Sequence, residues 1–222
     1  MSFFYLCRLI VKAFYNCNGF SGSLILPERL NSIGDNAFEG CNGFTGSLIL
    51  PEGLNSIGDN AFAGCSGFTG SLTLSEGLNS IGYRAFSDCS GFTGSLILPE
   101  GIISIRDCAF IGCSGFTGNL IIPKGVNIGN RAFDGCRGFS SLTIPEDMKG
   151  FATEVFAYCT GLTNIINYSI EPQTYAYLGF LGVPISNITL HVLSISLEKY
   201  RNDDFWGSFG NIVTIENSNN NN

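Results

Sequence analysis

Apolar and polar residues recur along this chain with a period of 24 residues that shortens to 23 near the end. The plainest marker is a cysteine that follows a phenylalanine by three positions, at Cys17, Cys41, Cys65, Cys89, Cys113, Cys136 and Cys159. A second column is leucine, at Leu24, Leu48, Leu72, Leu96, Leu120 and Leu142. A unit this short cannot bury its own apolar face, so successive units must stack. The period therefore predicts a solenoid whose equivalent residues lie about 4.8 Å apart.

The main strand of each unit is predicted from alternation. In residues 47–50, Leu48 and Leu50 should face the core while Ile49 faces solvent. Pro51 should end the strand because it cannot donate to a ladder. We expect one continuous array over residues 18–166, with a single ladder through the leucine column.

The rest of the unit should close the coil. Leu54 and Ile57 predict a second short extended stretch that faces the core, and the spacing of Ala61, Phe62 and Cys65 suits one helical turn. The phenylalanine column should stack inside. One glycine recurs in every copy, which predicts a positive φ at Gly19, Gly43, Gly67, Gly91, Gly115, Gly138 and Gly161.

Together these elements predict a repeat solenoid of the leucine-rich-repeat type, with short parallel strands and one helical turn per coil. We expect an array over residues 1–166 whose first repeat is incomplete. Residues 167–216 lose the period and hold the only tryptophan, so we expect a last irregular coil and a C-terminal cap there. Residues 217–222 are Asn-rich and polar, which is typical of a disordered tail.

The units resemble the BspA-like leucine-rich repeats of bacterial surface proteins. The resemblance covers roughly residues 6–216, and its carriers include Leu142-Thr-Ile144-Pro145 and Ile57-Gly-Asp-Asn-Ala61-Phe62. The closing segment is also similar: Ile188-Thr-Leu190-His-Val192, Tyr200, Phe205-Trp206, Phe209 and Asn211-Ile212-Val213. It departs from the family pattern at Leu193, where proline is usual. The resemblance implies an exported protein, on the cell surface or secreted, that takes part in adhesion to host or bacterial proteins.

Composition excludes several other classes. The net charge is −7 and no Lys/Arg cluster is present, so we expect no nucleic-acid partner. No apolar run approaches the roughly 18 residues of a membrane span. Residues 1–10 are apolar around Arg8 but lack a basic leader and a small-residue cleavage site, so we see no signal peptide in this chain.

Catalytic chemistry finds little support. His191 is the only histidine and should point outward from its strand, and a lone surface histidine is usually a plain polar substituent. Ser21 sits in a motif similar to a nucleophile elbow, but its equivalents Thr45, Thr69 and Thr93 mark it as repeat filler. We therefore expect no enzyme, no catalytic residue and no cofactor.

The cysteine column and a glutamate column each have a structural and a chemical interpretation. For the cysteines we favour buried free thiols over disulfides or a metal site, because their side chains share one direction and their spacing does not suit zinc. For the glutamates a solvated edge is favoured over a divalent-cation site: Glu28, Glu52, Glu76, Glu100 and Glu146, interrupted by Lys124. We expect no metal site.

The candidate binding residues are the outward positions of the main strand, which we call the isoleucine stripe: Ile25, Ile49, Thr73, Ile97, Ile121, Thr143 and Ile166. Two interpretations stay open, a β-branched ladder that stabilises an exposed sheet and an interaction face. The second predicts a protein-binding module whose partner is a host extracellular-matrix or bacterial surface protein, or another copy of the chain. The alternative is a spacer or assembly segment without a ligand of its own.

Overall fold

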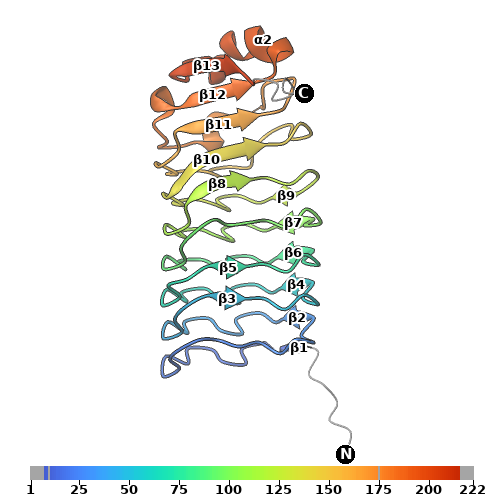
Figure 1. Cartoon of the computed structure of the whole chain (residues 1–222), viewed down its shortest axis with the longest axis vertical. Helices are drawn as coiled ribbons and strands as arrows, with labels where there is room; N and C mark the ends of the chain where they lie inside the picture. The colour runs from blue at the N-terminus through green and yellow to red at the C-terminus, as the bar shows by residue number, and fades with distance from the viewer. Residues whose placement is uncertain (1–7, 10, 175, 216–222) are drawn as a thin grey trace, which may run out of the picture.

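The computed structural model describes residues 8–9, 11–174 and 176–215. They form one stack of coils, with the first coil at one end and the last strands at the other (Figure 1). All strand pairs are parallel and join equivalent residues of neighbouring coils. This parallel β-solenoid confirms the predicted fold class. The Asn-rich tail, Cys7 and most of the first ten residues lie outside the described residues.

The longest ladder lies on the side that the sequence predicted as the second extended stretch. Its six strands follow the order β1-β2-β4-β6-β7-β9. They are β1 (Arg8–Leu9), β2 (Ser32–Ile33), β4 (Ser56–Ile57), β6 (Ser80–Ile81), β7 (Ser104–Ile105) and β9 (Asn127–Ile128). Each isoleucine from Ile33 to Ile105 is buried, and each pairs with the isoleucine of the next coil. The one unbroken ladder of the array is therefore this one.

The main strand face is interrupted, so the prediction of a single ladder through the leucine column is wrong. A two-stranded sheet joins β3 (Leu48–Ile49) to β5 (Leu72–Thr73). A five-stranded sheet joins β8 (Gly118–Ile121), β10 (Phe139–Ile144), β11 (Asn164–Asn167), β12 (Thr189–Val192) and β13 (Asn211–Thr214). Leu24 and Leu96 belong to neither sheet, although Leu96 is buried as predicted.

Hydrogen bonds at the preceding corner explain why the main strand can be interrupted. There the threonine amide of one coil donates to a glycine carbonyl of the coil before it. Thr93 donates to Gly70 at 2.9 Å, and Thr117 donates to Gly94 at 2.8 Å. These corner bonds and the six-stranded ladder hold the coils together, so the strand face does not have to pair at every coil.

The third side consists of linked turns in place of the predicted helical turn. Phe62 donates its amide to Ala85 of the next coil, and Cys65 donates to Phe62 within its own turn, at 2.7 and 3.1 Å. Two residues in each of these turns, four positions apart, have a left-handed backbone. The first of each pair has φ between 52° and 60°: Lys12, Asn36, Asn60, Arg84, Cys108, Arg131 and Glu154. The second is Asn16, Gly40, Gly64, Asp88, Gly112, Gly135 or Tyr158. A continuous helix cannot pass through such a residue, because this conformation is unfavourable for L-amino acids.

The recurrent glycine does not have the positive φ that the sequence predicted. None of Gly19, Gly43, Gly67, Gly91, Gly115, Gly138 and Gly161 lies in that region. The coils approach each other too closely there for a side chain. A Cβ atom on Gly67 would lie 2.0 Å from the carbonyl oxygen of Asn42 in the preceding coil. The column is glycine because of this contact between backbones.

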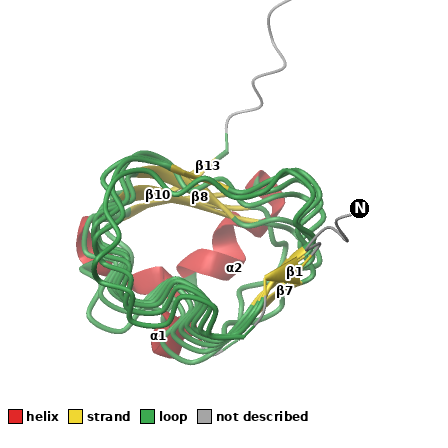
Figure 2. Cartoon of the chain, turned by 90° about the horizontal axis from the view of Figure 1, so that it is seen from below, coloured by secondary structure: helices red, strands yellow, loops and turns green. Residues whose placement is uncertain are grey.

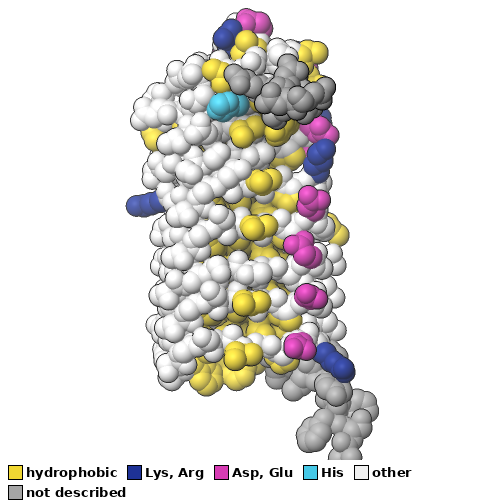
Figure 3. All heavy atoms as spheres, in the orientation of Figure 1, with side chains coloured by type: hydrophobic (Ala, Val, Ile, Leu, Met, Phe, Trp, Pro, Cys, Tyr) yellow, Lys and Arg dark blue, Asp and Glu magenta, His cyan; other side chains and the backbone are white. Residues whose placement is uncertain are grey.

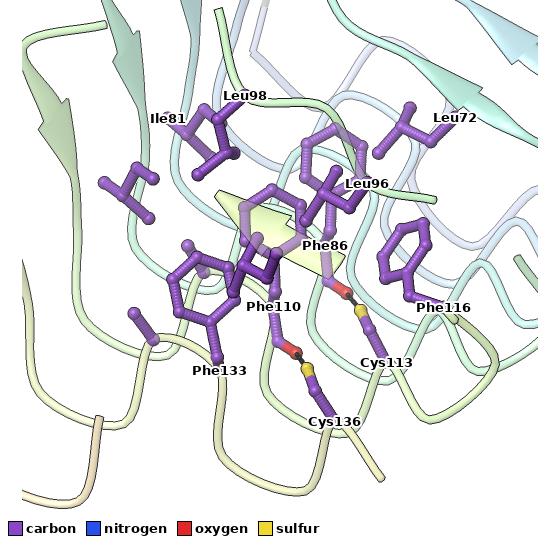
Figure 4. Close-up of a cluster of buried hydrophobic side chains, with 14 of the residues drawn as sticks. Leu72, Ile81, Phe86, Leu96, Leu98, Phe110, Cys113, Phe116, Phe133 and Cys136 are labelled. Carbon is purple, nitrogen blue, oxygen red and sulfur yellow. Dashed lines mark hydrogen bonds between the residues drawn. The ribbon is translucent and has the colours of Figure 1, made fainter. Parts of the chain in front are cut away.

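Phenylalanine rings fill the core in two parallel stacks, as predicted for the first of them. Phe38, Phe62 and Phe86 are buried, with ring centroids 5.1 and 5.3 Å apart. The other stack lies beside it and contains Phe44, Phe68, Phe92, Phe116 and Phe139. Figure 4 shows Phe86, Phe110 and Phe133 of the first stack and Phe116 of the other, in one buried cluster with Leu96 and Leu98.

The cysteine column lies in the core as free thiols. From Cys41 to Cys159 each thiol of the column donates to the phenylalanine carbonyl of the preceding coil: Cys113 reaches Phe86 at 3.0 Å, and Cys136 reaches Phe110 at 3.2 Å (Figure 4). Cys17, in the first coil, is half-buried. Burial raises the pKa of the Cys65 thiol to about 12. All eight cysteines of the described residues are free, and those residues contain no group of three or more metal-binding side chains.

We call the C-terminal segment, residues 167–215, the cap. Besides β12 and β13 it contains α1 (Ala176–Gly179), η1 (Ile185–Asn187), η2 (Ser194–Ser196), α2 (Leu197–Arg201) and η3 (Trp206–Ser208). Seen along the axis, α2 lies inside the outline of the ring (Figure 2), and in Figure 1 it lies at the end of the stack. Tyr200 and Trp206 are fully buried, so these elements cover the last apolar layer.

Candidate binding face

The isoleucine stripe points away from the core, as the alternation predicted. The exposed fractions are 88% for Ile25, 65% for Ile49, 72% for Ile97 and 57% for Ile121. Thr73 is exposed as well, whereas Thr143 and Ile166 are half-buried. The leucines on either side, such as Leu48 and Leu50, are buried. Figure 3 shows these side chains as a line of apolar groups along the length of the solenoid.

A column of serine and asparagine borders one side of the stripe, and its members bond from coil to coil. Ser47 accepts a hydrogen bond from the Ser71 amide at 3.1 Å, and the Ser71 hydroxyl donates to the Ser47 hydroxyl at 3.3 Å. Farther along, Asn119 donates to the Thr143 hydroxyl at 3.2 Å. These bonds satisfy polar groups within the face, so this border is fixed in place.

Glutamates form the opposite border, one per coil, and Figure 3 shows them as an acidic line parallel to the stripe. We call Glu28, Glu52, Glu76 and Glu100 the acidic column. All four are exposed, and none of them forms an ion pair with any residue that the structure describes. The column is the solvated edge that the sequence favoured, and it adds four negative charges beside the stripe.

The charge pattern changes in the coil that carries Lys124. Its ammonium group lies 2.8 Å from the carboxylate of Glu146, and this hydrogen bond raises the pKa of Lys124. Asp147 accepts a hydrogen bond from the Gly125 amide in the same region. The acidic column therefore ends at Glu100, and beyond it the edge is locally neutralised.

An open groove of about 980 Å³ runs between the stripe and the glutamate edge. Ile97, Ile121 and Thr143 form its apolar side, and Glu76 and Glu100 are among the residues on its charged side. The groove is a feature that the sequence analysis missed. The two columns could be read from the period, but the space between them, which Pro123 and Pro145 also line, could not.

Strand pairing continues the outward row into the cap. Ile166 pairs with His191, and His191 pairs with Val213. The histidine lies outward as predicted, with Nε2 3.4 Å from Oδ1 of Asn164. The hydrogen bond that the structure gives His191 is this contact with a neutral amide.

Other chemistry that the face could carry is limited. Within the described ranges, no three or more His, Cys, Asp or Glu residues gather as a metal site would require. Among these same residues no helix has the length and apolar character needed to cross a bilayer. The arrangement presents an apolar row, a polar border and an acidic border on one exposed face.

The comparisons with known proteins agree with this description. Residues 8–114 and 93–208 match the BspA type leucine rich repeat region, in six copies. The chain belongs to this family of leucine-rich repeat proteins. Comparison with curated proteins found no significant match.

Solved structures with the same fold come from several bacteria. The leucine-rich repeat protein of T. pallidum (TpLRR) is 24% identical, with a TM-score of 0.60 over 73% of this chain and 78% of that one. A leucine-rich repeat protein of Bacteroides ovatus is 21% identical, with a TM-score of 0.57 over 93% of this chain and 66% of that one. The pneumococcal vaccine antigen PcpA is 18% identical, with a TM-score of 0.53 over 95% and 67%. At identities of 18–24%, the structural similarity establishes a shared fold alone.

Proposed function

We propose that the chain is a non-enzymatic, adhesion-type binding module of a bacterial cell-surface or secreted protein. The isoleucine stripe is its contact surface, and its partner is a host extracellular-matrix or bacterial surface protein. The observation that carries the proposal is the exposure of four isoleucines along one face, between 57% and 88%. Contiguous apolar surface of this kind commonly marks an interaction site. Membership of the BspA-type family supports a surface location.

A spacer role is the second candidate, and one observation favours it. Ile49 pairs with Thr73 and Ile121 pairs with Thr143 in the strand register. Such cross-strand pairs of β-branched residues stabilise an exposed sheet by about 0.2–1 kcal/mol each. The stripe would then be a part of the scaffold, and the chain would hold other segments of a larger protein apart.

The experiment that separates these roles changes the stripe without changing the fold. Ile49→Lys and Ile97→Lys, separately and together, place charges on the apolar row. The protein is screened by surface plasmon resonance against extracellular-matrix and bacterial surface proteins, and the variants are measured on any partner found. We expect the double variant to lose binding, because a lysine in the centre of an apolar interface must be desolvated without a counter-charge.

Ile103→Lys is the matched control. Ile103 is 64% exposed, as Ile49 is at 65%, but it precedes β7 on the other ladder. It should bind as the unmodified protein does. Unchanged binding by the double variant would place the contact surface elsewhere, and failure of every tested protein to bind would leave the spacer role as the better account.

A further inference from the structure

The isoleucine stripe and the acidic column run side by side over the same coils. Ile25 stands with Glu28, Ile49 with Glu52, and Ile97 with Glu100, each pair on one coil. Ile25 and Glu28 line one surface depression together, and Ile97 and Glu100 line another. An occupant of this face therefore meets apolar contacts along one edge and carboxylates along the adjacent edge.

We propose that the occupant is a basic amphipathic α-helix of the partner protein, lying along the solenoid axis. The inference rests on the proposed function and specifies the partner's chemistry. Its apolar edge would cover the isoleucine stripe, and lysines or arginines on the neighbouring edge would meet the acidic column.

The spacing of the coils favours a helix over an extended strand. Coils repeat about every 4.8 Å, and a helix returns to the same edge about every 5.4 Å. Over the three intervals from Glu28 to Glu100 the mismatch is about 2 Å, which side-chain flexibility absorbs. An extended strand returns to one face about every 6.7 Å, so over the same intervals it would be out of step by about 6 Å. Four coils span about 14 Å, which is about 10 residues of helix.

Charge disfavours a second copy of the chain as the occupant. Each copy has a net charge of −7, and two antiparallel stripes face to face would bring their acidic columns close together. Like charges at an interface oppose association, whereas a basic segment neutralises them. The described residues offer no basic row to complement the column: Lys124 is already paired with Glu146, and Arg106 with Asp59.

The test uses a defined probe and the whole chain. A fluorescent peptide of about 18 residues carries leucines three and four positions apart, with a lysine directly after each leucine. A second peptide has glutamate in place of every lysine, and a third has a central proline that breaks the helix. Fluorescence anisotropy gives Kd at low and high salt. We expect only the basic helical peptide to bind, and its binding should weaken as salt rises.

A pair of double variants locates the contact. Glu52→Gln with Glu76→Gln removes two charges of the column and should weaken binding of the basic peptide about fivefold, the equivalent of about 1 kcal/mol. Glu198→Gln with Asp204→Asn removes two exposed charges of the cap and should leave Kd unchanged. Equal weakening by both pairs would show general attraction to an acidic protein and overturn the proposal.

Three other results would also overturn it: equal binding of the acidic peptide, equal or tighter binding of the proline peptide, or no binding of the basic one. If a natural partner is lost on Ile49→Lys/Ile97→Lys while the basic peptide fails to bind, the proposed function stands and the helix is wrong. If sedimentation shows that the chain dimerises and Ile49→Lys/Ile97→Lys abolishes the dimer, the occupant is a second copy of the chain.

Discussion

The array and the cap fill the same cylinder in different ways. In the array, Phe62 lies between its equivalents Phe38 and Phe86, with interplanar angles of 8° and 4°. In the cap, Trp206 meets Tyr200 at 74° and also contacts four phenylalanines. One contact repeated many times holds the array, whereas several unrelated contacts hold the cap.

The two regions therefore have different weaknesses. A coil of the array depends on its neighbours, and every neighbour supplies the same groups, including one buried thiol. The cap depends on polar partners that occur once. Asn167 and Gln173 exchange two hydrogen bonds, at 2.9 and 3.0 Å, and both side chains are buried. Changes that act on the groups repeated in every coil should destabilise the array. The removal of one hydrogen-bonding side chain should destabilise the cap.

Alkaline pH should produce the largest effect, and it should act on the array. Burial raises the pKa of Cys65 and Cys159 to about 12, and raises those of Cys89, Cys113 and Cys136 well above the ordinary 9.0. Above pH 9 the unfolded thiols lose protons that the folded ones keep. The contribution of the thiols to the free energy of unfolding is therefore fully present below pH 9. Above pH 9 it falls by about 1.4 kcal/mol per pH unit for each thiol, and for Cys65 and Cys159 the fall continues to about pH 12.

Urea unfolding between pH 8 and 11 measures this loss. Cys65→Ala with Cys89→Ala should reduce the slope of stability against pH, although both changes also remove some buried volume. An identical slope in this variant would mean that the thiols are not the groups that titrate.

Phe62→Ala should lower the free energy of unfolding by about 3–5 kcal/mol, the usual range for a buried phenylalanine. The cavity cannot close, because the coils on both sides are fixed by backbone hydrogen bonds. Phe20→Ala is the control. This ring belongs to the other stack and is 41% exposed, so its loss should be clearly smaller. Chemical denaturation measures both losses. Equal losses in the free energy of unfolding would show that the contribution of a ring to stability does not depend on its burial.

Gln173→Ala should lower the stability of the cap by about 1–3 kcal/mol, because it leaves the buried amide of Asn167 without its partner. Hydrogen exchange should show faster opening of α2 and β13 than of the array. Gln173→Met keeps most of the buried volume but loses the same hydrogen bonds with Asn167, so it should lose nearly as much as Gln173→Ala. A much smaller loss from Gln173→Met would assign the energy to packing in place of hydrogen bonds.

Arg84→Asn should give the smallest effect, a gain of about 0.5–1 kcal/mol. Arg84 has φ of 53°, and its equivalents in two other coils are already asparagine, which tolerates this conformation better. The reverse change, Asn60→Arg, should lose a similar amount. Thermal unfolding of the two variants measures the difference, and shifts of the same sign would contradict a conformational cause.

The sequence predicted which side chains face the core but not which backbone atoms meet between coils. Phe62, Cys65 and Ile49 repeat at a fixed period, so their direction follows from the pattern. The close approach at Gly67 and the bond from Cys65 to the Phe38 carbonyl depend on how one coil is seated on the next. Repetition shows that such a position matters without showing why.

The features of the candidate site were likewise predictable only in part. The stripe and the acidic column were visible as columns, and the structure places them side by side. The groove between them and the interruption of the ladder at Leu96 were not visible, because both depend on small differences between coils of similar sequence. In the cap no period exists, so the pairing of His191 with Val213 and of Asn167 with Gln173 could be found only in three dimensions.

The row of thiols bonded to carbonyl groups requires reducing conditions while the protein folds. While the stack is closed, six buried sulfurs from Cys41 to Cys159 are shielded from oxidants. In the unfolded chain the same sulfurs are ordinary reactive thiols. An added oxygen or a bridge between two of them would fill the space where each thiol meets a carbonyl, as Cys89 meets Phe62 at 3.0 Å, and the coils could not close. Refolding yield should therefore depend on a reductant until the last coil is in place, and not afterwards.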